Sequence, residues 1–249
     1  MNIFLYDSFL NHKKYGRLLS QIETRITDLG LNGKIFKLGL MRMLDDTIKN
    51  ELKRGAKTII VLGNNKIINQ AVNALSGNAA PLGIIPIGEA NNSIAKGLGI
   101  ESAESACDIL SARLIAEFDL GQANNTYFLE GAIIKNQGTI IDMSGDFTVE
   151  PGGKGVIQIL NLPNRGLKCP ADKSASPSDG ILEMIINSLS NKKFFPKQKD
   201  QSVFKIKKIT IINRQAQLLL DGSVSLPAPA EITVAKTRIN IIVGKNRNF

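Results

Sequence analysis

The feature that most constrains the fold is an alternation of short apolar runs and helix-like segments over residues 1–113. Thr58–Leu62 is apolar and β-branched, which is typical of a strand buried on both faces of a sheet. In Asn65–Leu75, apolar residues recur three and four positions apart, which indicates a helix. The alternation predicts a parallel sheet with helices on both faces, a Rossmann-like α/β domain. The other predicted strands are Asn2–Tyr6, Lys34–Leu38 and Leu82–Ile85, and the other predicted helices are Lys14–Leu29, Leu44–Leu52, Asn91–Leu98 and Ser102–Leu114.

The pattern changes near residue 115 to short β-rich runs separated by Gly, Pro, Asn and Asp. Such runs favour an antiparallel β-sandwich or an open barrel. We therefore predict an α/β domain over residues 1–113 and a β-sandwich domain over residues 114–249. The predicted strands of the second domain are Phe128–Ile134, Thr139–Met143, Val156–Leu160, Leu182–Ile186, Lys207–Ile212, Ala216–Leu220 and Ile239–Val243.

Composition narrows the classes of function. A net charge of +9 favours polyanionic partners, although lysine-rich faces can also serve solubility alone. Cys107, Cys169 and His12 are not at metal-ligand spacing, so a zinc finger or a disulfide framework is not expected. No apolar run reaches membrane-spanning length and the N-terminus shows no leader pattern, which predicts a cytoplasmic protein.

Two loops are candidates for ligand binding, because parallel sheets bind ligands at the carboxyl ends of their strands. The first, Gly63-Asn64-Asn65-Lys66, joins a predicted strand to a predicted helix. A glycine turn at a helix N-terminus can bring backbone N–H groups to a phosphate, and Lys66 adds a positive charge. The alternative is that this turn only closes the strand. The second loop is Gly88–Asn92.

Motifs in these loops and beyond resemble the diacylglycerol kinase and bacterial lipid kinase family. The segment after the first loop, IINQAVNAL, resembles the family's helix, and GNNKI stands where the family has GGDGT. PLGIIPIGEANN resembles PLGIIPxGTxND, and FDLG resembles the entry into the family's second domain. Two later motifs of the family also have counterparts here. One is CPA followed by SDGILE, and the other is LDGS. The resembling pieces span roughly residues 58–243 in the family's order.

The resemblance implies the diacylglycerol kinase and NAD kinase fold, with ATP and Mg²⁺ as cofactors and a lipid as substrate. Asp221 matches the family's general base, Asp119 an acid at the interdomain cleft, and Asp179 part of a structural magnesium site. From the residues alone, Asp221 can instead be a turn residue of an Asp-Gly hairpin. The resemblance also implies a set of nucleotide-binding positions, which are Gly63, Asn64, Asn65, Lys66, Gly88, Glu89, Asn91 and Asn92.

Several positions depart from the family's pattern. Asn65 and Asn92 stand where the family has acids, and an amide brings no negative charge to Mg²⁺. Glu89 could restore one carboxylate, or could simply interact with a helix dipole. The segment Tyr6–Leu10 stands where the family has a phosphate-contacting loop. In addition, any segment that returns from the second domain to the first is expected to be short or absent.

Two functions remain open at this point. One is ATP-dependent phosphorylation of a lipid hydroxyl, with reduced activity, and the other is a non-catalytic descendant that binds nucleotide or lipid. The segment Lys192–Lys208 interleaves lysine with phenylalanine, which suits an anionic membrane surface but also a solvated loop. No motif for specific nucleic-acid binding accompanies the charge.

Overall fold

The computed structural model describes residues 1–39, 43–88, 92–136, 138–163, 176–189, 199–213, 216–247 and 249. They form two compact units, one of Met1–Phe118 with Thr237–Asn248 and the other of Asp119–Lys236 with Phe249. No helix among the described residues is long and apolar enough to cross a bilayer.

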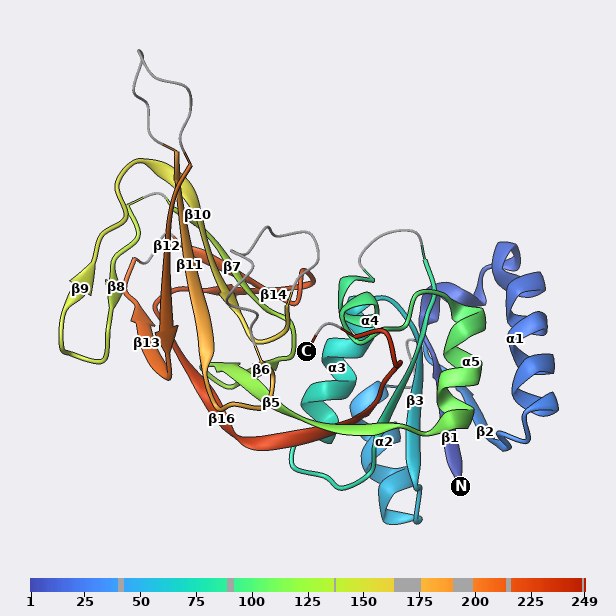
Figure 1. The fold of residues 1–249 in the computed structure, drawn as a ribbon. Helices are drawn as coiled ribbons and strands as arrows, with labels where there is room; N and C mark the ends of the chain where they lie inside the picture. The colour runs from blue at the N-terminus through green and yellow to red at the C-terminus, as the bar shows by residue number, and fades with distance from the viewer. Residues whose placement is uncertain are drawn as a thin grey trace. The chain divides into compact units, whose positions relative to one another are not determined.

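The first unit contains the predicted parallel sheet (Figure 1). Its strands lie in the order β2-β1-β3-β4, and the buried runs of β3 and β4 form its centre. α1 and α5 cover one face of the sheet, while α2 and α3 cover the other. The strands are β1 (Asn2–Tyr6), β2 (Gly33–Lys37), β3 (Thr58–Gly63) and β4 (Leu82–Pro86). The helices are α1 (Gly16–Asp28), α2 (Leu44–Lys53), α3 (Asn65–Leu75), α4 (Ser93–Gly97) and α5 (Ala103–Ala112), and two short 3₁₀ turns, η1 (Ser8–Asn11) and η2 (Lys13–Tyr15), follow β1.

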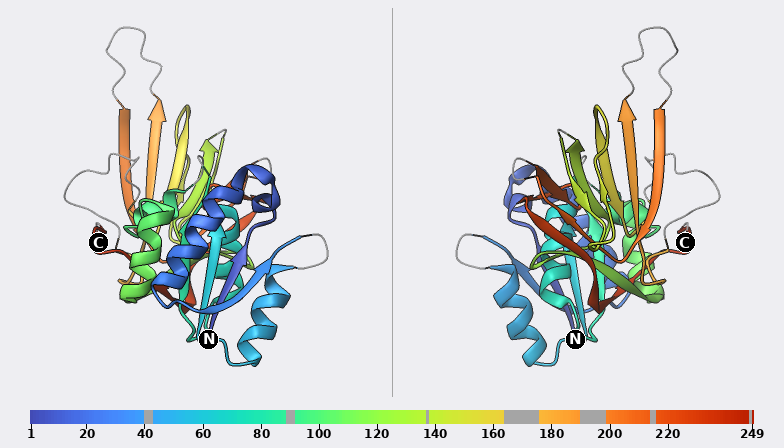
Figure 2. Two further views of the ribbon diagram at one scale, coloured as in Figure 1. Left: turned by 90° about the vertical axis from the view of Figure 1, so that its right-hand side faces the viewer. Right: turned by 90° about the vertical axis from the view of Figure 1, so that its left-hand side faces the viewer.

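The second unit is an antiparallel β-sandwich, as predicted. Its six-stranded sheet has the order β12-β11-β10-β7-β14-β15, and Figure 2 shows β7, β10, β11 and β12 side by side. Isoleucines of this sheet, such as Ile157 and Ile159, pack against Ile209 and Ile232 of the opposite layer in a buried core. The strands are β5 (Ile115–Ala123), β6 (Thr126–Phe128), β7 (Gly131–Asn136), β8 (Ile141–Asp142), β9 (Thr148–Val149), β10 (Lys154–Leu160), β11 (Leu182–Leu189), β12 (Lys199–Ile206), β13 (Lys208–Ile211), β14 (Gln217–Leu220), β15 (Val224–Pro227) and β16 (Ala230–Ile242).

Three parts of the second half differ from the predicted elements. The predicted strand Phe128–Ile134 is divided, because β6 ends at Phe128 and β7 begins at Gly131. Part of the lysine-rich segment forms β12, which pairs along its whole length with β11. The last strand, β16, begins in the second unit, and its C-terminal end pairs with β4 through Ile241 and Leu82. The chain therefore returns to the first unit by the short segment Thr237–Asn248.

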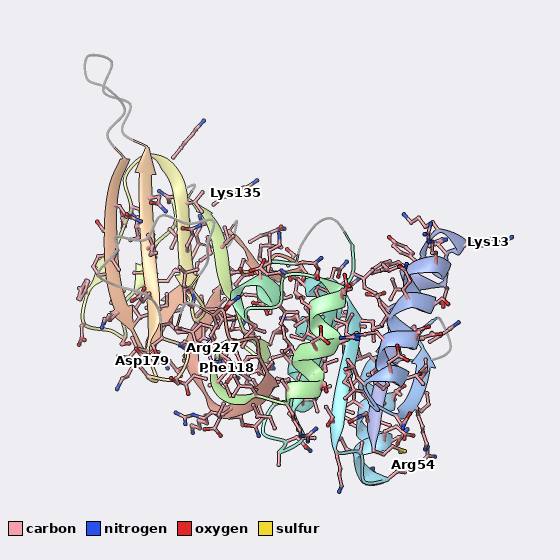
Figure 3. The ribbon with its side chains drawn as sticks, turned by 45° about the vertical axis from the view of Figure 1, so that its right-hand side comes forward. Lys13, Arg54, Phe118, Lys135, Asp179 and Arg247 are labelled. Carbon is pink, nitrogen blue, oxygen red and sulfur yellow. The ribbon has the colours of Figure 1, made fainter. Side chains whose placement is uncertain are left out.

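A buried carboxylate ties α2 to the edge strand β2. Glu51 is 1% exposed, and its carboxylate lies 2.6 Å from Arg54 Nη1 and 3.3 Å from Lys34 Nζ. Arg54 is labelled in Figure 3. Burial raises the pKa of Glu51, but the hydrogen bonds from Arg54 and Lys34 outweigh burial and leave the pKa below its ordinary value of 4.5. The ionised form is therefore favoured in the folded state.

Replacing Glu51 by Gln is expected to flatten the pH dependence of stability in acid. Because the folded-state pKa lies below the unfolded one, ionised Glu51 stabilises the fold above pH 4.5. That contribution disappears as the pH falls through the lower, folded value. Urea denaturation between roughly pH 5 and pH 3 measures the effect. Asp45→Asn, which removes an exposed ion pair with Lys49 on the same helix, is the control, and parallel curves for native protein and Glu51→Gln would contradict the assignment.

Candidate functional site

The loops after β1, β3 and β4 are joined at the carboxyl end of the parallel sheet. The N–H of Asp7, directly after β1, donates to the carbonyl of Leu62 at 3.0 Å. The N–H of Ile87, directly after β4, donates to the carbonyl of Gly63 at 3.0 Å. The two strand ends predicted for ligand binding, those of β3 and β4, thus form one continuous edge with the end of β1.

Gly63 and Asn64 shape the turn from β3 into α3. Gly63 has a φ of 155°, and a Cβ at this position would lie 2.8 Å from Ile67 Cγ2 and 3.1 Å from Asp7 Cβ. Any other residue would therefore be strained here. Asn64 caps the helix, because its side-chain oxygen accepts from the N–H of Lys66 at 3.0 Å. The Lys66 side chain is exposed at the helix N-terminus.

Asn65, the position of the family's acid, is directed into the interior. It is 1% exposed, and its Nδ2 donates to Ser93 Oγ at 2.8 Å. Its Oδ1 accepts from the N–H of Ile94 at 3.4 Å. The amide therefore links the start of α3 to the start of α4 with one donor and one acceptor, and brings no charge to the turn.

The second loop is described in part. Gly88 has a φ of 109°, and its carbonyl accepts from Asn92 Nδ2 at 2.7 Å. The Oδ1 atom of Asn92 is buried and has no hydrogen-bond partner among the described residues. Glu89 and Asn91 lie outside the described residues. The structure thus brings Gly63, Asn64, Asn65 and Lys66 together with Gly88 and Asn92 at the same edge.

In the second unit, Asp221 is both a turn residue and a buried carboxylate. It opens the turn between β14 and β15 with φ 49°, followed by Gly222 with φ 63°, as an Asp-Gly hairpin turn requires. It is 1% exposed, and its carboxylate accepts from three successive backbone N–H groups, those of Leu129, Glu130 and Gly131, at 3.0, 2.8 and 3.1 Å. These bonds fix the turn that divides β6 from β7.

Asn161 connects this turn to Asp119. It is 1% exposed, and its Nδ2 donates to the carbonyls of Asp119 and Leu129, each at 2.9 Å. Its own N–H donates to the carbonyl of Glu130 at 2.9 Å. Asp119 is 4% exposed and accepts from the N–H of Gly180 at 2.7 Å. Asp119 and Asp221 are therefore held in one network of the second unit.

Asp179 occupies a different environment from the two buried acids. It is exposed, and its Oδ1 accepts from the N–H of Ile181 at 3.0 Å, which closes a local turn (Figure 3). In the described part of the chain, no group of three or more His, Cys, Asp and Glu side chains could hold a metal ion. Cys169, in the motif that precedes Asp179, lies outside the described residues.

Two residues of these networks were not among the predicted site residues. Asp7 follows a strand end, so its position at the ligand-binding edge of a parallel sheet was a usable signal. Asn161 carries no comparable signal, because its partners Asp119 and Leu129 lie 42 and 32 positions away in the sequence.

Comparisons with known proteins agree with this architecture. Residues 3–123 match the family model described as the diacylglycerol kinase catalytic domain. The structure is similar to that of a diacylglycerol kinase from Bacillus anthracis, with a TM-score of 0.75, 18% identity, and coverage of 98% of this chain and 97% of that chain. It is also similar to an NAD kinase from Archaeoglobus fulgidus in complex with ATP, with a TM-score of 0.61, 11% identity, and coverage of 99% and 95%.

At these identities, the similarity to solved structures shows the fold alone. No curated protein matches the sequence. The domain match, the parallel sheet with its strand-end loops and the antiparallel sandwich together give the assignment. Residues 3–123 belong to the diacylglycerol kinase catalytic domain family, and the whole chain has the α/β fold of the solved diacylglycerol kinase and NAD kinase structures.

Proposed function

We propose that this protein binds ATP at the turn Gly63–Lys66 and the loop Gly88–Asn92, and that it phosphorylates a lipid hydroxyl only slowly. The observation that carries the proposal is the buried amide of Asn65. It completes the nucleotide-binding edge structurally, but it replaces the carboxylate that a phosphoryl-transfer site uses to organise its metal and nucleotide.

Three features support phosphate binding at the turn. Gly63 lets the chain make the tight turn into α3, since a Cβ there would lie 2.8 Å from Ile67 Cγ2. The N-terminus of the eleven-residue helix α3 adds positive potential to the turn. The exposed Lys66 contributes a full positive charge at the same place.

Asp119 and Asp221 are the carboxylates proposed to act on the lipid hydroxyl that accepts the phosphoryl group. A lipid hydroxyl needs a carboxylate to orient it and to accept its proton during phosphoryl transfer. The Asp221 carboxylate already accepts three backbone N–H groups, which leaves less lone-pair capacity for a substrate hydroxyl. This engagement agrees with slow transfer. A protein that binds nucleotide or lipid without catalysis is the second candidate. The uncharged amide of Asn65 and the three N–H bonds to the Asp221 carboxylate favour this candidate as well.

An anionic lipid surface is the proposed setting of the reaction. Residues 192–198 of the lysine-rich segment lie outside the described residues, whereas Lys205 and Lys207 are exposed in or beside β12. Lys135 of β7 is exposed as well (Figure 3). Phe204 packs against the sandwich core, so it stabilises the unit rather than contacting lipid.

Replacing Lys66 by Glu is expected to weaken ATP binding more than about tenfold, because a phosphate-facing cation becomes an anion. Isothermal titration calorimetry measures the dissociation constants. Lys53→Glu is the matched control. This exposed lysine lies at the C-terminal end of α2, before β3 begins, and so it is not in a loop that follows a strand of the sheet. A dissociation constant that is the same in native protein and Lys66→Glu would show that the turn is only structural.

A further inference from the structure

A patch of exposed cations lies where the chain leaves β1 and enters α1. This cationic patch consists of Lys13, Lys14 and Arg17, and Figure 3 shows Lys13 directed outward from the start of α1. The segment Ser8–Ile22 contains these three permanent charges and no Asp or Glu. In the described part of the chain, none of the three cations forms an ion pair with an acid. The positive charge of the patch is therefore available to a partner.

Two aromatic side chains are set into the cationic patch. The rings of Phe9 and Tyr15 contact each other edge to face, with their centroids 5.3 Å apart and an interplanar angle of 67°. Lys14 Nζ lies 4.9 Å from the centroid of the Tyr15 ring. Both rings are half-buried, so each has one side against the protein and the other toward water. Half-buried aromatic rings beside lysine are typical of side chains at the boundary between a bilayer and water.

The segment that carries the patch is held in place by its own contacts. Leu10 is 2% exposed, and Asn11 Nδ2 donates to the carbonyl of Leu38 at 3.1 Å. The N–H of Tyr15 donates to the carbonyl of His12 at 3.0 Å. Because the backbone is already ordered, a partner that binds here does not have to order it.

The arrangement of the rings favours a lipid surface over a nucleic acid. Proteins that bind single-stranded nucleic acid offer open ring faces on which successive bases stack. Here Lys14 lies over the Tyr15 ring and both rings are half-buried, so the pair offers no row of open faces. An anionic bilayer requires only positive charge near its surface and aromatic side chains at its interface.

We propose that the cationic patch docks on the surface of an anionic lipid bilayer. The inference rests on the proposed lipid-surface setting of the reaction, but it adds a contact on the first unit to the lysines of the second. The patch follows Asp7, whose N–H is bonded to the carbonyl of Leu62 beside the turn Gly63–Lys66. Docking therefore holds the ligand-binding edge of the parallel sheet close to the membrane that contains the lipid substrate.

The test is sedimentation of the protein with phosphatidylcholine vesicles, with and without phosphatidylglycerol. Replacing all three cations of the patch by Gln is expected to lower the partition coefficient for the anionic vesicles about 10²-fold, because each cation near such a surface contributes about fivefold. The matched control replaces three exposed lysines on α2 and before β3 by Gln, which changes the net charge equally and is expected to keep most of the native binding. These lysines are Lys49, Lys53 and Lys57.

A fluorescence measurement locates the contact. The chain contains no Trp, so Tyr15→Trp introduces a single indole within the patch. Its emission is expected to shift to shorter wavelength with anionic vesicles and to stay unchanged with phosphatidylcholine alone. Tyr127→Trp, on β6 of the second unit, is the control and is expected to show no shift.

Three outcomes would contradict the proposal. Equal vesicle binding by native protein and the patch variant, with no shift in Tyr15→Trp, would overturn the patch alone and leave the contact to the second unit. Weaker binding of a single-stranded oligonucleotide by the patch variant, with vesicle binding retained, would assign the patch to nucleic acid. Native protein that does not bind anionic vesicles would overturn the patch and the lipid-surface setting together, whereas calorimetry with ATP tests the nucleotide site separately.

Discussion

Replacing Asn65 by Asp is expected to raise ATP-dependent phosphorylation of diacylglycerol by about 10²–10³-fold over a native rate close to background. Positioning and charge neutralisation supply nearly all the catalysis of phosphoryl transfer, so a missing charge is costly. The site can accept the carboxylate, because the Ser93 hydroxyl and the Ile94 N–H can both donate to it. Radiolabelled ATP with mixed lipid acceptors in micelles measures the rate.

The matched control for this gain is Asn69→Asp. Asn69 is 2% exposed and lies on the same helix, one turn farther from the strand end. The same substitution there buries a charge without placing it at the nucleotide. An equal rate in native protein and Asn65→Asp, or an equal rise in the control, would contradict the explanation. Robust native turnover that is lost in Asp221→Asn would instead establish an active enzyme despite Asn65.

Replacing Asp221 by Ala is expected to lower the free energy of unfolding of the second unit by about 3 kcal/mol. Three backbone N–H groups lose their charged acceptor at a site that is 1% exposed. The residue also has a φ of 49°, which Ala adopts less readily than Asp. Urea denaturation followed by a probe in the second unit measures the change.

Asp179→Ala is the control for this loss. Asp179 is an exposed turn residue of the same unit, and its side-chain Oδ1 accepts from the N–H of Ile181. Its replacement by Ala is expected to lower the free energy of unfolding by less than about 1 kcal/mol. A stable Asp221→Ala variant that has lost only activity would mean that the carboxylate serves chemistry and not the turn. Any kinetic study of Asp221 therefore needs the unfolding curve beside it.

Local patterns were sufficient for most of the parallel sheet. The β-branched run of β3 and the helical spacing of α3 are short-range signals, and both elements form where they were predicted. Gly63 was also identified locally, because a strand-to-helix glycine turn is a recognisable motif. The alternation of strands and helices fixed the fold class for the same reason.

The remaining features depend on contacts between distant segments. The return of β16 rests on the pairing of Ile241 with Leu82, which no local pattern specifies. Asp7 reaches the turn only because β1 and β3 pair in a register that places it beside Leu62. The burial of Asn65 depends on Ser93, 28 positions away, so its structural role could not be distinguished from a ligand-binding role by sequence.

The central claim is that nucleotide binds at the carboxyl end of the parallel sheet, and thermal unfolding of the native protein with increasing ATP and MgCl₂ tests it most directly. A ligand at about 100 times its dissociation constant stabilises the folded state by about 2.7 kcal/mol, so the account predicts a saturable rise of several degrees in Tm. The same rise is expected to be reduced in Lys66→Glu and retained in Lys53→Glu. A native Tm that does not change at millimolar ATP, with or without Mg²⁺, would contradict the account.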